Sequence, residues 1–282
     1  MNQPAFAKMA FKNLQHLLQE VSGQEPSGRL ICYPLGNTED PTTCNYKELM
    51  QHAQRASWSL RASSTGSELT PGSAVLLHFD SHWDNIIWFW AVILAGCVPV
   101  MSTTLPNNAS LRTAHLDHLS NTLMKPLCLI RKNLVSEFSQ QVSMKAVAVD
   151  SLNQQTVLPM KDFTESELGD TAAMMLTSGS TGKSKAVCLS HGQILAALEG
   201  KLSVVALHGE SFLNWIRLDH VASLIEIHLQ AILARKDQVH IHSTDVLSNP
   251  IRFIDLIDKH RVTRTFAPNS FLAKLRVALS VR

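Results

Sequence analysis

The residues whose types and spacing point most directly to chemistry form a phosphate-binding loop. An apolar run from Ala172 to Leu176 predicts a buried strand, and it leads into Thr177-Ser-Gly-Ser-Thr-Gly182, which contains no bulky side chain. Such a segment can turn its backbone amides inward around an anion. Hydroxyl groups add further hydrogen-bond donors, from Thr177, Ser178, Ser180 and Thr181. Lys183 and Lys185 add positive charge at the far end, so the segment predicts phosphate binding.

The general nucleotide-binding motif G-x-x-x-x-G-K-S/T matches only the second half of this loop. Gly182-Lys183-Ser184 fits it, but Thr177 stands where the first glycine is required. The motif also needs a helix at its lysine, whereas Lys185-Ala-Val-Cys-Leu189 predicts a short strand and a helix begins only near His191. We therefore predict that the loop joins two strands. The alternative is a plain Ser/Gly linker between strands.

A longer string around the loop resembles a family signature. Leu176-Thr-Ser-Gly-Ser-Thr-Gly-Lys-Ser-Lys-Ala-Val187, with Leu189-Ser-His-Gly192 after it, is similar to the signature of the adenylate-forming superfamily. That superfamily holds acyl-CoA synthetases, luciferases and the adenylation domains of nonribosomal peptide synthetases. Its members use ATP and Mg²⁺ and join a carboxylate to the α-phosphate, giving an acyl-adenylate and pyrophosphate. The family usually has proline where Ser184 stands.

The resemblance implies roles for the residues of the loop. Lys185 is implied as the catalytic residue, because its charge would offset the charge that builds up on the departing pyrophosphate. The implied ATP-binding residues hold the β- and γ-phosphates, and they are Thr177, Ser178, Gly179, Ser180, Thr181, Gly182 and Lys183.

A second segment, Asn214-Trp-Ile-Arg-Leu-Asp-His-Val221, lies where the family places its acyl-substrate pocket. In amino-acid-activating members an aspartate here holds the substrate ammonium, and Asp219 is its counterpart. In fatty-acyl and aryl-activating members a histidine ends the segment, and His220 fits that role. Together with Glu226-Ile-His228, the segment is most similar to adenylation domains of fungal synthetase-like multidomain proteins. Asp219 could instead cap the helix that begins near His220, and both interpretations stay open.

Other candidate sites are not supported by the pattern of residues. His240 and His242 share one face of a predicted strand and, with His228, suggest a metal site. They have no acidic or cysteine partners at ligand spacing, so we predict no metal ligands. No G-x-S-x-G segment supports a nucleophilic serine at Ser178 or Ser180.

The composition indicates a globular chain without a charged surface. Hydrophobic residues make up 45% and charged residues 17%, and the formal net charge of +2 gives no basis for nucleic-acid or membrane binding. No continuous secretory signal opens the chain, and the apolar run 86–101 is too short for a membrane span. The cysteines are odd in number and widely spaced, at Cys32, Cys44, Cys97, Cys128 and Cys188. We therefore expect a reducing, cytoplasmic location.

The elements that must position these residues alternate between strands and helices, which predicts an α/β fold of parallel sheets with helices on both faces. Strands are expected within 29–33, 71–79, 95–100, 126–130, 144–149, 172–176, 185–189, 212–216, 238–242 and 263–267. Helices are expected within 6–21, 45–56, 81–94, 110–123, 133–141, 191–199, 220–234, 250–260 and 269–279. We assign residues 1–24 to an N-terminal helix and extension, and 25–282 to a partial AMP-binding domain.

The resemblance also implies that later motifs of the family lie beyond residue 282. These are the segment whose glutamate holds magnesium, the aspartate that grips the ribose, and the mobile lid with its lysine. We therefore expect the N-terminal subdomain of an adenylate-forming enzyme, truncated, from secondary-metabolite biosynthesis and inactive alone. A complementing C-terminal half or self-association is expected. The alternative is a non-catalytic binding or interaction module.

Overall fold

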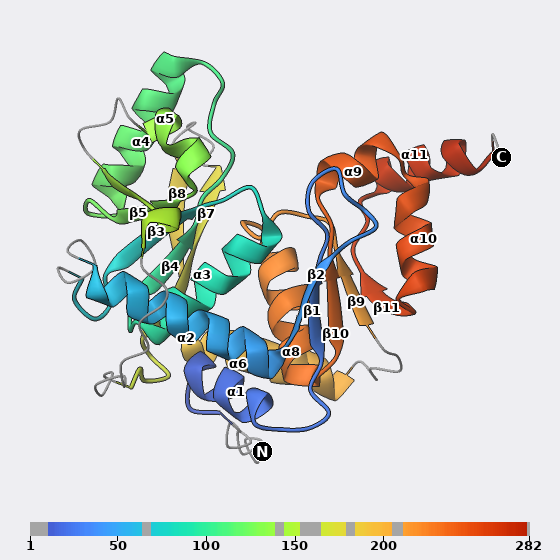
Figure 1. The fold of residues 1–282 in the computed structure, drawn as a ribbon, viewed down its shortest axis with the longest axis horizontal. Coiled ribbons are helices and arrows are strands. Elements are labelled where there is room, and N and C mark those ends of the chain that lie inside the picture. Colours follow the sequence, from blue (N-terminus) through green and yellow to red (C-terminus); the bar gives the residue numbers. More distant parts are fainter. Residues whose placement is uncertain are drawn as a thin grey trace, which may run out of the picture.

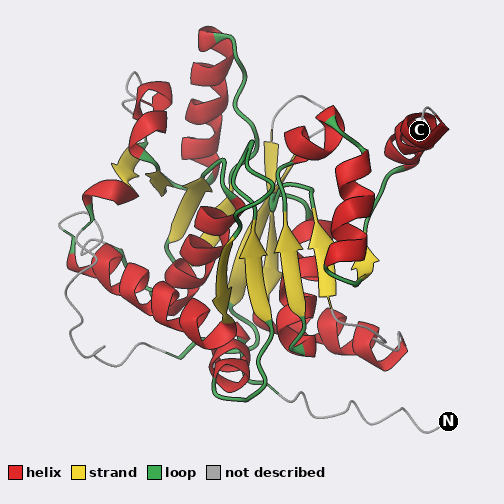
Figure 2. Cartoon of the chain, turned by 45° about the vertical axis from the view of Figure 1, so that its right-hand side comes forward, coloured by secondary structure: helices red, strands yellow, loops and turns green. Residues whose placement is uncertain are grey.

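Two β-sheets, with helices between them and on their outer faces, organise the computed structural model (Figure 1). The structure describes residues 11–63, 69–138, 144–152, 165–178, 184–204 and 211–280. In Figure 2 the strands lie in the middle of the molecule and the helices flank them. The prediction of an α/β fold is confirmed.

The first sheet is built from the two ends of the described chain. Its strands are β1 (Arg29–Cys32), β2 (Thr42–Asn45), β9 (Ser211–Asn214), β10 (Asp237–His240) and β11 (Val262–Thr265). They lie in the order β11-β9-β10-β1-β2, and only the β1–β2 pair is antiparallel. The first sheet therefore brings β1 beside a strand that follows it by some two hundred residues.

The second sheet is built from the middle of the chain. Its strands are β3 (Ala74–His78), β4 (Val98–Met101), β5 (Leu127–Ile130), β6 (Lys145–Ala148), β7 (Thr171–Ser178) and β8 (Ser184–Ser190). They lie in the order β6-β5-β3-β4-β7-β8, and only the β7–β8 pair is antiparallel.

The helices form three layers around the two sheets. The α-helices are α1 (Leu14–Ser22), α2 (Tyr46–Ala62), α3 (His82–Leu94), α4 (Ala109–Thr122), α5 (Val135–Phe138), α6 (His191–Val204), α7 (Val221–Ser223), α8 (Gln230–Ala234), α9 (Ser243–Ser248), α10 (Ile251–Lys259) and α11 (Asn269–Ser280). Short 3-10 turns are η2 (Lys132–Leu134) and η3 (Val149–Ser151), and η4 (Leu224–Leu229) is a π-helical segment. The central layer holds α1, α2, α3, α6, η4 and α8, while α4 and α5 cover one outer face and α9 to α11 the other.

Two-residue alternation along the strands distributes their side chains between these layers. In β3, Val75 and Leu77 face the central layer, and Leu76 faces the outer layer with α4. In β1, Leu30 faces the central layer and Ile31 the layer with α9 to α11. Both sheets are therefore covered on both faces, which explains the near-continuous apolar runs in their sequences.

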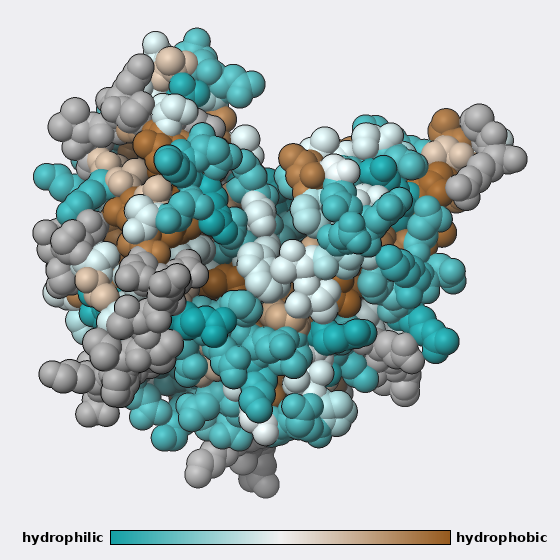
Figure 3. All heavy atoms as spheres, in the orientation of Figure 1, coloured by the Kyte–Doolittle hydropathy of each residue, from teal (hydrophilic) through white to brown (hydrophobic). Residues whose placement is uncertain are grey.

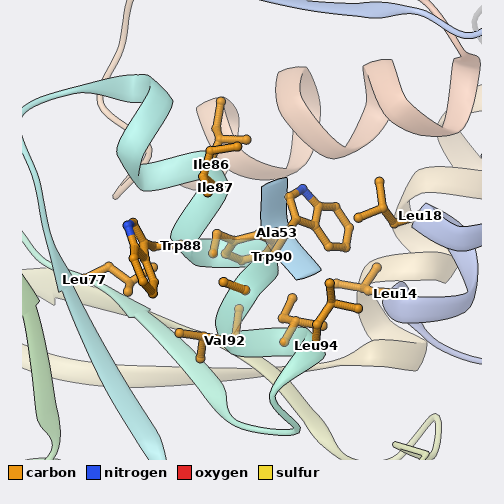
Figure 4. Close-up of a cluster of buried hydrophobic side chains, with 14 of the residues drawn as sticks. Leu14, Leu18, Ala53, Leu77, Ile86, Ile87, Trp88, Trp90, Val92 and Leu94 are labelled. Atoms are coloured by element: carbon orange, nitrogen blue, oxygen red, sulfur yellow. The ribbon is translucent and has the colours of Figure 1, made fainter. Parts of the chain in front are cut away.

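Helix α3 is apolar on all sides because it lies in the middle of the central layer. Ser81 caps its first turn by accepting a hydrogen bond from the amide of Asp84. In Figure 4, Trp90 projects toward Leu14 and Leu18 of α1, while Trp88 lies on the other side beside Leu77. The helix thereby joins the N-terminal helix to the second sheet.

Several elements differ from the sequence prediction. Strand β2 was not among the predicted strands, and it pairs with β1 because backbone hydrogen bonding does not need apolar side chains. Helix α9 was not predicted, and the helix expected over 133–141 is a 3-10 turn followed by the short α5. The start of the helix expected within 6–21 lies outside the described residues, as do residues 153–164, which precede the strand that leads into the loop.

No helix in the described ranges has both the length and the apolar character that crossing a bilayer requires. All five cysteines are free thiols. Cys188 on β8 is exposed, and the other four are buried.

Candidate functional site

The predicted phosphate loop is bracketed by β7 and β8, which form an antiparallel hairpin. Thr177 lies opposite Lys185, and Ser178 lies opposite Ser184. The prediction that the loop joins two strands is therefore confirmed. The residues between the strands lie outside the described residues, and they are Gly179, Ser180, Thr181, Gly182 and Lys183.

The described residues at the base of the hairpin expose polar groups to solvent. Thr177 is exposed, and its Oγ1 donates to the carbonyl oxygen of Lys185 at 3.5 Å. Lys185 itself is exposed. His118 of α4 donates through Nε2 to the carbonyl oxygen of Ser184 at 2.7 Å. Helix α4 therefore braces β8 beside the loop, and the lysine ammonium is accessible to an anion.

The second predicted part of the site begins where β9 ends and borders a small cavity. Residues that follow the carboxyl ends of four strands, β3, β4, β9 and β10, line it. They include Asp80, His82, Ser102, Arg217, Asp219 and His242. Ligands of parallel α/β sheets bind outside the carboxyl ends of the strands, so the cavity has the position expected of a binding site.

Arg217 and Asp219 face each other at this cavity. Arg217 Nε lies 3.6 Å from Asp219 Oδ1, and Arg217 Nη2 donates to the carbonyl oxygen of Ser102 at 3.2 Å. Both Nε and Oδ1 are buried without a hydrogen-bond partner. The side chain of Asp219 is only 9% exposed. A buried donor and a buried acceptor that are both unsatisfied beside a cavity are suited to contact a bound ligand.

His220, the other predicted substrate residue, lies on the solvent side of this arrangement, with its Nε2 4.0 Å from Asp219 Oδ1. Its side chain is 64% exposed, and it does not line the cavity. His220 is the N-cap residue of α7 and makes no side-chain capping hydrogen bond. The N-cap position therefore falls one residue after Asp219, so the structure does not support the interpretation of Asp219 as the cap.

The hairpin and the cavity lie at the same edge of the second sheet. Strand β7 is the parallel neighbour of β4, with Met175 opposite Met101. Ser102 follows β4 directly and accepts the hydrogen bond from Arg217. Asp219 follows β9 of the first sheet, and the loop follows β7 of the second sheet. The structure nevertheless places Asp219 near the end of β4, the strand next to β7.

Sequence reasoning missed several residues of the cavity, notably Ser102, Arg217 and His82. His82 donates through Nε2 to the carbonyl oxygen of Ile241 at 3.2 Å. Burial, with the nearby His242 adding to it, lowers the pKa of His82 to about 4. Their positions in the sequence could have identified them, because each of these residues comes shortly after a strand predicted to be parallel and buried.

The described ranges contain no group of three His, Cys, Asp or Glu side chains arranged to hold a metal ion. His228 and His240 lie in the interior, while His242 caps α9 by accepting from the amide of Thr244 at 3.2 Å. His242 is therefore in a different environment from His228 and His240.

Comparison with known proteins gives a consistent result. The family model described as AMP-binding enzyme matches residues 18–281. The chain is 62% identical over 271 residues to nonribosomal peptide synthetase atrA of Aspergillus terreus, and 53% identical over 277 residues to nonribosomal peptide synthetase ucdA of Aspergillus ustus. Each match covers 96% of this chain, which spans 29% of the length of each synthetase.

A solved structure supports the same relationship. The adenylation domain of a keto acid-selecting NRPS module bound to keto acyl adenylate is similar, with a TM-score of 0.80 and 25% identity. The similarity covers 95% of this chain and 50% of the solved chain.

Proposed function

The chain belongs to the AMP-binding enzyme family, and from this premise we propose that it activates a carboxylic acid with ATP, giving an acyl-adenylate and pyrophosphate. It is an adenylate-forming domain related to the adenylation domains of nonribosomal peptide synthetases. The similarity to two fungal synthetases extends the proposal to secondary metabolism.

The observation that carries this proposal is the exposed Lys185 directly after a hydroxyl-rich loop between two strands. In the proposed reaction the carboxylate attacks the α-phosphorus, and the bond from that phosphorus to the bridging oxygen of pyrophosphate breaks. Loop amides and hydroxyls hold the β- and γ-phosphates, and Lys185 offsets the charge on the leaving group. The described residues offer no ligand set for Mg²⁺, so we assign none of them to it.

Asp219 and Arg217 bear on the class of acid. A substrate ammonium needs a carboxylate that is not already beside a cation, and Asp219 lies against Arg217. We therefore propose an acid without an α-ammonium group. The similar solved domain, described as keto acid-selecting and bound to keto acyl adenylate, supports a 2-oxo acid.

Binding of stable, non-hydrolysable acyl-adenylate analogues tests the function without requiring turnover. Analogues of phenylpyruvate, phenyllactate and phenylalanine share one ring and differ at the α-carbon, and calorimetry would compare their affinities. We expect the phenylalanine analogue to bind most weakly. A non-hydrolysable ATP analogue keeps the β- and γ-phosphates that an acyl-adenylate has lost, and the Lys185→Ala variant should bind it about 10- to 100-fold more weakly, because a charged hydrogen bond is lost.

Lys274→Ala is the matched control, because Lys274 is an exposed lysine on α11 of the other sheet. It should bind like the unmodified chain. If no analogue binds, the function is wrong, and the non-catalytic interaction module becomes the better explanation.

We further propose that a complementing C-terminal half covers the outer side of α11. Leu272, Val277 and Leu279 are exposed there, and β11 has no strand on its outer side among the described residues. Figure 3 shows apolar atoms at this projecting end of the molecule. Sedimentation of the chain with and without a segment that continues a relative should reveal a one-to-one complex. If the chain self-associates, or remains a monomer when the segment is added, the proposal that a C-terminal half covers α11 is wrong.

A further inference from the structure

A chain of polar side chains crosses the central layer behind the cavity. Its members come from α2, α3, η4, β9 and β10, and all are buried: Tyr46, Trp90, Asn214, His228, Gln238 and His240. A polar group buried without a partner is destabilising, so the hydrogen bonds of these residues can be followed one by one. We call this set the histidine network.

The first half of the network has one possible direction of hydrogen bonding. Trp90 Nε1 can only donate, and it donates to His228 Nε2 at 2.9 Å. His228 must therefore carry its proton on Nδ1, which donates to Gln238 Oε1 at 2.7 Å. Gln238 Nε2 donates to the hydroxyl of Tyr46 at 2.9 Å, and that hydroxyl donates to the carbonyl oxygen of Lys236 at 2.5 Å.

The second half follows from the orientation of Gln238. Its Oε1 also lies 2.8 Å from His240 Nε2, so His240 Nε2 carries the proton and donates. His240 Nδ1 is then an acceptor, and it receives a hydrogen bond from Asn214 Nδ2 at 3.2 Å. Both histidines are neutral in this arrangement, and each has one defined tautomer.

Asn214 connects the histidine network to the backbone of the substrate segment, which we define as Ile216 to Asp219. Its Nδ2 also donates to the carbonyl oxygen of Ile216 at 2.8 Å, and its Oδ1 accepts from the amide of Ile216 at 3.2 Å. The carbonyl oxygen of Ile216 accepts a further hydrogen bond from Ser223 Oγ at 3.1 Å. The backbone that leaves β9 is therefore held from both sides, directly before Arg217 and Asp219.

An amide group by itself could sit in either of two flipped orientations. In the flipped orientation, Asn214 Oδ1 would face the lone pair of His240 Nδ1 and its NH₂ group would face the amide of Ile216. Both contacts would then be repulsive. The acceptor on His240 therefore adds to the backbone groups of Ile216 in favouring this orientation of Asn214.

The π-helical segment η4 contributes to this geometry. His228 lies in η4 and is packed against Trp90 and His240, with ring centroids 6.0 and 6.1 Å apart. A π-turn adds one residue to a helical turn and rotates the side chains that follow it. It is a rare local conformation, and here it accompanies the hydrogen bond from Trp90 Nε1, which fixes the tautomer of His228 from outside β10.

We propose that His240 is a positioning residue, which, through its Nδ1 acceptor and oriented by Gln238 and His228, holds Asn214 and thereby the substrate segment from Ile216 to Asp219. The claim that this positioning affects substrate binding rests on the proposed activation of an acid. The claim that His240 holds the segment does not rest on it, and the two claims can be tested separately.

Two replacements of His240 separate its two hydrogen bonds. Counting bonds from Cα, Asn places an acceptor at the position of Nδ1, and Gln places a donor at the position of Nε2. His240→Asn therefore keeps the contact with Asn214, and His240→Gln keeps only the contact with Gln238. Both variants shorten or straighten the same buried side chain, so each is a control for packing in the other.

Amide hydrogen exchange in the full chain, read by NMR, tests the claim that His240 holds the segment. The protection of the Ile216 amide should fall about 10-fold in His240→Gln, because one hydrogen bond of ordinary strength is lost, and should be retained in His240→Asn. The amide of Tyr33, which donates to the backbone carbonyl of His240 at 2.8 Å, is the internal reference and should be unchanged. Equal protection of Ile216 in both variants overturns the proposal.

A second measurement does not depend on whether the variants fold. Imidazole ¹⁵N shifts of the unmodified chain should show His228 protonated on Nδ1 and His240 on Nε2. The opposite tautomer of His240 would leave no acceptor for Asn214 and overturns the proposal.

The claim about substrate binding is tested with the acyl-adenylate analogue that binds most tightly. His240→Gln should bind it about 10-fold more weakly while its affinity for ATP stays within about twofold, and His240→Asn should resemble the unmodified chain. A loss of ATP affinity that equals the loss of analogue affinity indicates general misfolding and overturns the positioning role. If the unmodified chain binds no analogue, the proposed function fails, and the amide and tautomer results still decide whether His240 positions the segment.

Discussion

The hairpin loop and the histidine network are both polar and both adjoin the candidate site, but they are built in opposite ways. The loop is one contiguous segment, and the described residues at its base, Thr177 and Lys185, are exposed. The network is assembled from five elements and is wholly buried. A function that relies on backbone amides and exposed charge can be recognised in a short sequence. A function that relies on burial requires the fold to be known.

The pKa values of the histidines in the network follow from their burial. Burial lowers the pKa of His228 to about 4 and lowers that of His240 well below its ordinary value. The nearby His82 and His228 lower the pKa of His240 further. The network therefore stays neutral at physiological pH, and its hydrogen-bond directions are retained.

The largest expected effect is acid sensitivity of the fold. Burial lowers the pKa of His82 and His228 to about 4 and that of His240 well below its ordinary value, so the folded chain resists protonation of these histidines, whereas the unfolded chain takes up protons near pH 6.5. Stability is therefore retained above about pH 6.5 and falls as the pH drops below it. Between pH 7 and pH 5 these histidines should remove on the order of 5 kcal/mol of unfolding free energy. Urea unfolding at several pH values measures this loss of unfolding free energy.

His228→Gln should reduce the slope of stability against pH by about a fifth, whatever its effect at pH 7, because it removes one of five buried histidines with strongly lowered pKa values, the others being His78, His82, His191 and His240. A slope that is unchanged by the substitution would show that the network does not control acid stability.

A smaller effect is expected at one end of the network. A Cβ on Gly28 would meet the carbonyl group of Lys236, which accepts from Tyr46, and would lie 2.9 Å from Tyr46 Cε2. Gly28→Ala should therefore lower the unfolding free energy by about 3 kcal/mol. Gly200→Ala in α6 is the control, since nothing lies within 4 Å of its added methyl group, and it should be neutral or stabilising. Equal effects of the two substitutions would contradict the close approach.

Trp90→Phe should have an intermediate effect, lowering the unfolding free energy by about 1.5 kcal/mol, because His228 Nε2 loses the indole donor while the replacing ring remains apolar. The same variant should allow the other tautomer of His228, visible in its ¹⁵N shifts. Retention of the original tautomer would show that Gln238 alone determines it.

The smallest effect on stability is expected in the loop region. Lys185→Ala should change the unfolding free energy by less than about 0.5 kcal/mol, since the side chain is exposed. A Lys185→Ala chain that keeps its stability but loses affinity for the ATP analogue would be the reverse of the Trp90→Phe result. A strongly destabilised Lys185→Ala would remove the contrast between the two regions.

These contrasts explain how much could be predicted from the sequence. The alternation of strands and helices and the two strands around the loop were predicted, because apolar runs and loop composition are local properties. Strand β2 was missed, since Thr42-Thr-Cys-Asn45 carries no apolar pattern and exists only because β1 offers it an edge. Helix α9 and the π-segment were missed for similar reasons, as both depend on the caps and contacts of the folded chain.

The site was predicted in part. Asp219 was singled out and lines the cavity, but its neighbour Arg217 was not, and the charge pair changes what Asp219 can bind. The sequence analysis considered His228, His240 and His242 only as metal ligands. No spacing in the sequence reveals that His228 and His240 share one oxygen atom of Gln238, because β10 and η4 meet only after the sheet has formed.

The strand order of the first sheet has a consequence for biosynthesis. Arg29 of β1 and its partner Asp237 are 208 positions apart, whereas all strands of the second sheet come from residues 74–190. As the chain emerges from the ribosome, the second sheet can therefore assemble while β1 still lacks its neighbour. Closing so long a loop is slow compared with local pairing. The hairpin of β1 and β2 must wait with an open edge until β10 has been translated, which makes this interval the period when a chaperone would be most useful.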